Sequence, residues 1–120
     1  MKYLVTDDSK LSRRVLVKSL LAYTDEAHIF QATNGLEAIK LTLKERPDIV
    51  FLDLTMPEMD GYEALPKLLK IKSDIKVVVI SADVQEQAKD KVLSRGAKFH
   101  IAKPINPQKL KEILEALEND

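Results

Sequence analysis

Short hydrophobic runs in this chain end beside residues that carry an acid, a hydroxyl or an amine. The runs cover residues 3–5, 49–52, 77–80 and 99–102, and a further candidate strand covers residues 27–31. They are continuous rather than alternating, which is typical of parallel strands covered by helices on both faces. Parallel strands bring their carboxyl ends to one edge of a sheet, so the side chains that follow the runs are expected to converge. These side chains belong to Asp7, Asp8, Asp53, Ser81 and Lys103.

Helical patterns alternate with the predicted strands. Strand and helix in alternation indicate βαβ units with right-handed crossovers. We predict an α/β fold, a flavodoxin-like (βα)5 arrangement with a five-stranded parallel sheet in the order 2-1-3-4-5 and helices on both faces. The apolar stripes expected to face the sheet are Leu11, Val15, Leu16 and Leu20; Leu36, Ile39 and Leu43; Leu65, Leu68 and Leu69; Val84, Ala88 and Val92; and Leu110, Ile113, Leu114 and Leu117.

The residues that punctuate the helices agree with this arrangement. Asn34 with Glu37, and Asp83 with Glu86, have the spacing of capping boxes with an Asx cap. Pro66 falls inside the third helical pattern, where it removes a hydrogen-bond donor. We therefore expect that helix to start late or irregularly.

Length and composition restrict the class of protein. The 120 residues make one ordinary domain, which we expect to span residues 1–120 with no output domain. Lysine plus arginine and aspartate plus glutamate both number 19, which disfavours a general nucleic-acid or membrane-surface binder. The chain has no cysteine, its start does not resemble a signal peptide, and its apolar runs are too short to span a bilayer. We expect a cytoplasmic protein without membrane insertion.

The converging side chains suggest a particular chemistry. Three carboxylates close together repel, so one takes a proton unless a cation lies among them. Mg²⁺ suits such a site, because it binds through one or two carboxylates, waters and a substrate phosphate. An aspartate can also act as a nucleophile and become an aspartyl phosphate. Lys103 then offers a charge, and Ser81 a hydroxyl, to the phosphoryl oxygens.

Five segments, in this order and with their spacing, resemble the motifs of a known family. The chain is similar over its entire length to the receiver domains of two-component response regulators, and specifically to the stand-alone chemotaxis-type members. The segments are residues 4–9 (LVTDDS), 53–61 (DLTMPEMDG), 81–82 (SA), 96–97 (GA) and 103–104 (KP).

The resemblance implies a role for each acidic residue. Asp53 would accept the phosphoryl group and also contact the metal. Asp8 would bind Mg²⁺ directly and Asp7 chiefly through water, while Thr55 would supply a backbone carbonyl. Lys103 would pair with the phosphoryl group, and its bond to Pro104 would be cis.

The resemblance also implies a switch, in which one residue differs from the family pattern. Ser81 would be the switch hydroxyl. Family members usually have tyrosine or phenylalanine three residues before the lysine, but His100 is at that position here. An imidazole fills similar space and adds a group that titrates near neutral pH. We hypothesise that this makes the switch sensitive to pH.

The function that the resemblance implies is a phospho-acceptor switch in a two-component phosphorelay. A sensor histidine kinase or phosphotransfer protein would supply the phosphoryl group. A downstream protein target would bind the face made by the fourth helix, fifth strand and fifth helix. A monomer is expected, with phosphorylation-dependent dimerisation as an alternative.

Three alternatives also fit parts of the pattern. A Mg²⁺-dependent aspartyl-phosphate hydrolase of the haloacid-dehalogenase type would need a second aspartate two residues after the nucleophile, where Thr55 lies. A flavodoxin would need a phosphate-binding loop where Asp7 and Asp8 would repel phosphate. A degenerate receiver acting only as an interaction module is disfavoured, because all five acceptor-site positions are filled.

Overall fold

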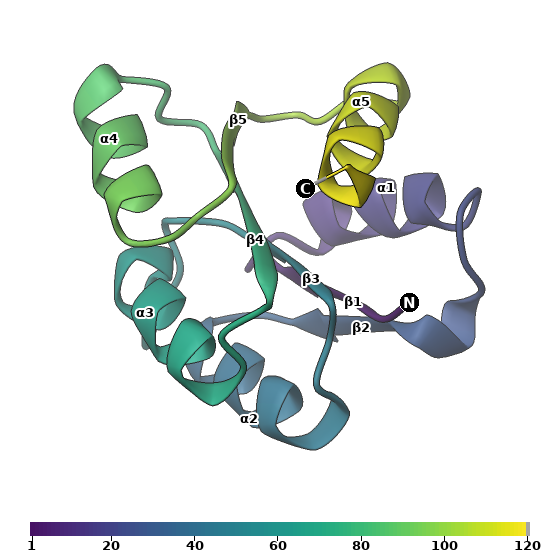
Figure 1. Ribbon diagram of the computed structural model, residues 1–120, viewed down its shortest axis with the longest axis horizontal. Coiled ribbons are helices and arrows are strands. Elements are labelled where there is room, and N and C mark those ends of the chain that lie inside the picture. The colour runs from purple at the N-terminus through teal and green to yellow at the C-terminus, as the bar shows by residue number, and fades with distance from the viewer. Residues whose placement is uncertain (120) are drawn as a thin grey trace.

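A computed structural model describes residues 1–119 of the chain. Strands and helices alternate from one end to the other, and a short 3-10 turn, η1, precedes the second strand (Figure 1). The elements are β1 (Tyr3–Thr6), α1 (Lys10–Leu20), η1 (Glu26–His28), β2 (Ile29–Ala32), α2 (Gly35–Glu45), β3 (Ile49–Leu52), α3 (Gly61–Ile71), β4 (Lys76–Ser81), α4 (Glu86–Ser94), β5 (Phe99–Ala102) and α5 (Pro107–Glu118).

All five strands are parallel and form one sheet in the order β2-β1-β3-β4-β5, which confirms the predicted topology. In the central pair, Thr6 of β1 lies opposite Leu52 of β3. The next residues, Asp7 and Asp53, therefore leave the sheet side by side. The backbone N–H of Asp53 donates to the carbonyl of Thr6 at 3.0 Å, which fixes this register at the strand ends.

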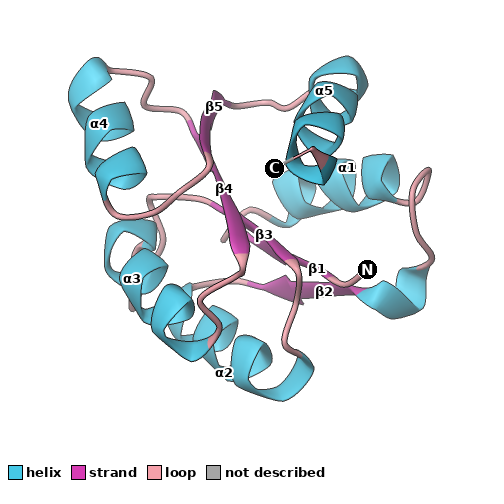
Figure 2. Cartoon of the chain, viewed as in Figure 1, coloured by secondary structure: helices cyan, strands magenta, loops and turns pink. Residues whose placement is uncertain are grey.

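The core has two layers, one on each face of the sheet. Helices α1 and α5 cover one face, and α2, α3 and α4 cover the other (Figure 2). Alternate residues of β4 divide between the layers: Val77 and Val79 pack on the three-helix side, and Val78 and Ile80 on the two-helix side. The central strands are buried on both faces, which explains their continuous hydrophobic runs.

The helical stripes were only partly right as a prediction of the core. Leu16 and Leu20 of α1 are buried, but Leu11 is 70% exposed and Val15 is 45% exposed. Leu36, Leu43 and Val84, which belong to the predicted stripes of the second and fourth helices, are also exposed. Periodicity identifies an apolar side of a helix, but the width of the sheet decides how much of that side is covered. The boundary of the second strand was also displaced, because η1 takes residues 26–28.

One of the two predicted Asx caps is present, although the Glu37 carboxylate accepts from the N–H of Thr33 at 2.6 Å and not from that of Asn34. The Asn34 side chain accepts from the N–H of Glu37 at 2.9 Å, as predicted. The prediction for Asp83 was wrong, because α4 begins after Gln85. Asp83 instead accepts from the N–H of Gln85 at 3.0 Å, in the loop between β4 and α4. An Asx residue stabilises a turn as readily as a helix start, and here the turn forms.

The expected late start of the third helix was also wrong. Helix α3 begins at Gly61, where the Asp60 side chain caps the N–H of Glu63 at 2.9 Å, and it continues through Pro66. Proline cannot donate to the carbonyl four residues earlier, which is that of Tyr62. The Arg95 guanidinium donates to this carbonyl at 3.0 Å instead. A contact from the end of α4 thus replaces the hydrogen bond that Pro66 removes.

Candidate functional site

Three carboxylates meet at the carboxyl edge of the central strands. One ligand atom from each of Asp7, Asp8 and Asp53 lies within 4.8 Å of the others. Asp7 and Asp53 are buried, whereas Asp8 is exposed. The Ser9 hydroxyl caps α1 by accepting from the N–H of Ser12 at 3.2 Å, which leaves Asp8 free of that task. The sequence prediction that these acids converge is confirmed.

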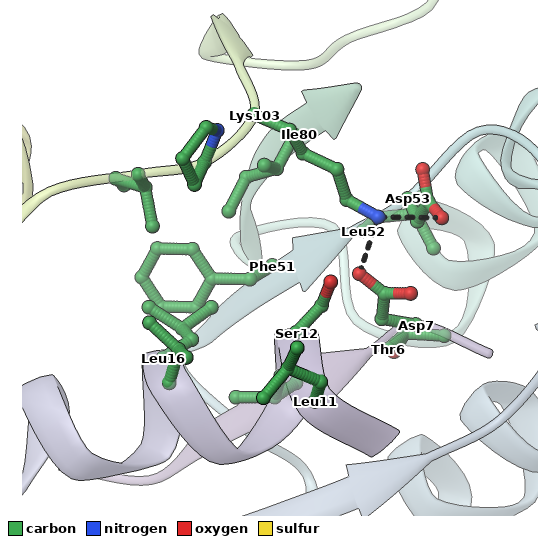
Figure 3. Close-up of a pocket in the computed structure, with 14 residues that line it drawn as sticks. Thr6, Asp7, Leu11, Ser12, Leu16, Phe51, Leu52, Asp53, Ile80 and Lys103 are labelled. Atoms are coloured by element: carbon green, nitrogen blue, oxygen red, sulfur yellow. Dashed lines mark hydrogen bonds and ion pairs between the residues drawn. The ribbon is translucent and has the colours of Figure 1, made fainter. Parts of the chain in front are cut away.

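Lys103 bridges the two buried acids from the end of β5. Its ammonium group lies 2.7 Å from Asp7 Oδ2 and 3.2 Å from Asp53 Oδ2, as the dashed lines of Figure 3 show. Burial alone would lower the pKa of Lys103, but the hydrogen bonds and charges of Asp7 and Asp53 outweigh it and raise the pKa. The lysine is therefore held as a cation above the acids. The bond from Lys103 to Pro104 is cis, as predicted.

Both carboxylate oxygens of Asp53 have donors. Oδ1 accepts from the N–H of Leu54 at 2.8 Å, and Oδ2 accepts from Lys103. Burial, followed by the charge of Asp7, raises the pKa of Asp53 despite the opposing influence of Lys103. One cation does not fully compensate the clustered acids, so the site favours a further positive charge.

The donor set fits a hard divalent cation such as Mg²⁺. Such ions prefer carboxylate and carbonyl oxygens, and the three acids bring their oxygens close enough to share one ion. Thr55, whose carbonyl was predicted as a ligand, is an exposed residue of the loop that follows Asp53. Its role as a ligand stays a prediction.

Ser81 and His100 lie on neighbouring strands on the same face of the sheet. Ser81 is buried at the end of β4, and its hydroxyl accepts from the N–H of Asp83 at 3.0 Å. His100 lies opposite Val79 in the β4–β5 pairing, two residues before the level of Ser81. Within residues 1–119, His100 Nε2 is buried and has no hydrogen-bond partner. A ring is therefore present at the expected place, and its part in a switch stays a prediction.

Arg13 supports the acid cluster and was missed by sequence reasoning. From α1 its Nη1 donates to the carbonyl of Asp7 at 2.8 Å, and its Nε donates to Gln31 Oε1 of β2 at 3.1 Å. The arginine thus holds the loop that presents Asp7. Its partners are a backbone carbonyl and a glutamine of another strand, and neither gives a sequence signal that would have found it.

Replacing Arg13 with methionine is expected to weaken Mg²⁺ binding by about tenfold, because groups that orient metal ligands typically carry an effect of that size. Isothermal titration of the protein with MgCl₂ measures this affinity. Arg14→Met is the matched control, since Arg14 is the exposed neighbour on the same helix. Equal affinities in the two variants would show that Arg13 does not position the site.

A cavity of about 340 Å³ opens beside the acids, between α1 and the segment that follows β5. Its walls are mostly apolar, and Leu11, Leu16 and Phe51 point into it in Figure 3. Asp7, Asp53 and Lys103 lie at its polar end. An apolar group inserted here would reach the edge of the acid cluster.

Comparison with known proteins identifies the class to which this fold and site belong. Residues 3–115 match the family model of the response regulator receiver domain, and the chain belongs to this family. The chemotaxis protein CheY of Listeria monocytogenes is 38% identical over 115 residues, which are 96% of each chain. Sporulation initiation phosphotransferase F of Bacillus subtilis is 34% identical and matches 95% of this chain and 90% of that protein.

Solved structures agree with the family assignment. A chain in the crystal structure of the CheX–CheY–BeF3–Mg²⁺ complex from Borrelia burgdorferi superimposes with a TM-score of 0.90 at 29% identity. The match covers 98% of this chain and 88% of that one. Such domains are signalling switches rather than enzymes. The protein-glutamate methylesterase/protein-glutamine glutaminase of Pyrococcus abyssi is 40% identical, but the match covers only 32% of its length.

Membership of the receiver-domain family also bears on the alternative functions and on the partners of the protein. Family membership disfavours the hydrolase and flavodoxin alternatives. It implies a phosphodonor protein and a downstream target, without identifying either. None of the helices within residues 1–119 is long and apolar enough to cross a membrane.

Proposed function

We propose that this protein is a phospho-acceptor switch in which Asp53 takes a phosphoryl group from a phosphohistidine of a partner. The observation that carries the proposal is the convergence of Asp7, Asp8 and Asp53 within 4.8 Å, with Lys103 bridging two of them. In the transfer, the bond between histidine nitrogen and phosphorus breaks, and a bond between phosphorus and an Asp53 oxygen forms.

The residues of the site have separate proposed roles in metal binding and in stabilising the phosphoryl group. Asp7, Asp8, Asp53 and the Thr55 carbonyl are the proposed holders of Mg²⁺, which would neutralise the acids and the incoming phosphoryl oxygens. Because Lys103 already contacts Asp53 Oδ2, its ammonium group is positioned to form an ion pair with the phosphoryl oxygens once Asp53 is phosphorylated. The hydrogen bonds that Asp53 accepts from Leu54 and Lys103 fix the orientation of its carboxylate.

The exposed side of α1 is the proposed docking place for the phosphodonor. Leu11 and Val15 form an apolar row beside the mouth of the cavity. Lys10, Arg14 and Lys18 form an exposed basic row on the same helix, which has no acidic residue. A partner helix with matching apolar and acidic side chains would bury these rows and bring its phosphohistidine to Asp53.

The output proposed here acts through protein contact. Phosphorylation would shift a two-state equilibrium of the α4–β5–α5 face, and a target protein would bind one state. Ser81 and His100 are the proposed switch residues, since both lie at the strands that lead into this face. We also propose that residues 1–120 act as a single receiver domain.

Intact-mass spectrometry after incubation with acetyl phosphate tests the acceptor. A phosphoryl adduct is expected only when Mg²⁺ is present, and Asp53→Asn is expected to remove it. Asp74→Asn is the control, because this exposed acid lies between α3 and β4, outside the cluster, and should leave the adduct unchanged. An adduct that forms without Mg²⁺, or that persists in Asp53→Asn, would contradict the proposal.

A further inference from the structure

Helix α4 is attached to the rest of the molecule by few apolar side chains. Ala88 and Val92 are its buried residues, whereas α3 buries Gly61, Ala64, Leu65 and Leu68. Little apolar burial means a low local stability, so the polar contacts of α4 matter more for its position. Two cationic residues near its C-terminal end make such contacts, and both reach the same residue of α3.

That residue is Tyr62. The Lys91 ammonium lies 4.3 Å from the centre of the Tyr62 ring, in cation–π geometry. The Arg95 guanidinium donates to the Tyr62 carbonyl at 3.0 Å. Lys91 and Arg95 are four residues apart, so they project from one side of α4. The carbonyl is available because Pro66 has no N–H to donate to it.

Tyr62 is also linked to the acceptor. The preceding residue, Gly61, donates its N–H to the carbonyl of Leu54 at 3.0 Å, and Leu54 in turn donates to Asp53. A change in the loop after Asp53 therefore acts directly on the first turn of α3. Burial, and then the charges of Asp83 and Asp60, raise the pKa of Tyr62.

We propose that Tyr62, Lys91 and Arg95 form a clamp that holds α4 against α3 and couples the position of α4 to the acceptor loop. This inference rests on the proposed function and adds a second route to the output face, beside that of Ser81 and His100. Phosphorylation changes the loop after Asp53, moves the first turn of α3 and weakens the clamp. Weakening the clamp by substitution therefore favours the same state.

Hydrogen–deuterium exchange of the unphosphorylated protein tests the clamp itself. Lys91→Gln and Arg95→Gln are each expected to raise amide exchange in α4 about fivefold, with no change in the central strands. Lys89→Gln is the matched control, because Lys89 is exposed on the same helix. Tyr62→Phe keeps both the ring and the carbonyl and should exchange like the wild type, whereas Tyr62→Leu should resemble Lys91→Gln. Unchanged α4 exchange in Lys91→Gln and Arg95→Gln would overturn the inference.

The rate of phosphorylation by acetyl phosphate tests the coupling. If the clamp disfavours the conformation that accepts the phosphoryl group, Lys91→Gln should raise this rate about threefold, because a larger fraction of the protein then has that conformation. A rate equal to or below that of the wild type would overturn the coupling. Failure of the proposed function is distinguishable, because it would abolish the adduct in every variant and leave the exchange result of the unphosphorylated proteins intact.

Discussion

Replacing Gly61 with alanine is expected to lower the free energy of unfolding by about 3 kcal/mol, at the upper end of the usual cost of overpacking. A Cβ atom at this position would lie 2.2 Å from the carbonyl oxygen of Asp53 and 3.0 Å from the Cα of Leu54. Both neighbours are backbone atoms, so no side-chain rotation relieves the contact. Alanine has a higher helix propensity than glycine, so a loss of stability in Gly61→Ala has to come from the close contact of the new Cβ atom with the backbone.

The same substitution is expected to slow phosphorylation by more than tenfold. To relieve the close contact, either α3 or the end of β3 that carries Asp53 must move, and small displacements of a reacting group slow a reaction strongly. Thermal unfolding should show a midpoint lower by about 10 °C. Gly96→Ala is the matched control. Its φ of 107° and its approach to the Leu69 side chain make alanine unfavourable there as well, but far from the acceptor. Gly96→Ala should lose stability without slowing phosphorylation, and an equal rate loss in both variants would show that the effect is not local.

The parts of the site that sequence reasoning found are those fixed by strand ends. A hydrophobic run followed by a polar residue predicts both a buried strand and the point where it ends at the edge of the sheet. The convergence of Asp7, Asp53, Ser81 and Lys103 could therefore be predicted from the sequence alone. The order of the strands follows from the same alternation, since few topologies satisfy four successive βαβ units.

The parts it missed depend on contacts between elements that the chain separates. Arg13 reaches the carbonyl of Asp7 and a glutamine of β2, and neither contact has a periodic pattern. We predicted an irregular start for α3 because Pro66 lacks a hydrogen-bond donor. The sequence does not show that an arginine 29 residues later supplies the missing donor. Leu11 belongs to an apolar stripe and is nevertheless exposed, since a stripe does not show where the sheet ends.

Replacing Lys103 with methionine is expected to move Mg²⁺ binding and phosphorylation in opposite directions. The ammonium group occupies the space between Asp7 and Asp53 and satisfies part of their charge. Without it the acids should bind Mg²⁺ about tenfold more tightly, because one competing positive charge is gone. Phosphorylation by acetyl phosphate should slow on the order of 100-fold, because the group that stabilises charge on the phosphoryl oxygens is lost.

Stability of this variant should depend on pH in a defined direction. Burial and Asp7 already raise the pKa of Asp53, and removing Lys103 raises it further. A carboxyl group whose pKa is higher in the folded state contributes most stability below its unfolded pKa, and this contribution is lost as pH rises through the folded value. The free energy of unfolding of Lys103→Met should therefore be close to that of the wild type in acid and lower by about 2 kcal/mol at neutral pH. This loss is smaller than that for a fully buried ion pair, because the lysine side chain is 24% exposed.

Urea unfolding at several pH values, with and without MgCl₂, measures both effects. Added Mg²⁺ should recover the stability of Lys103→Met at neutral pH, since the ion binds the folded state and replaces the missing cation. Lys89→Met is the control, because it removes the same charge from an exposed position on α4. Weaker Mg²⁺ binding in Lys103→Met than in Lys89→Met would mean that the lysine organises the acids for the metal rather than competing with it, and the charge balance proposed for the site would then be wrong.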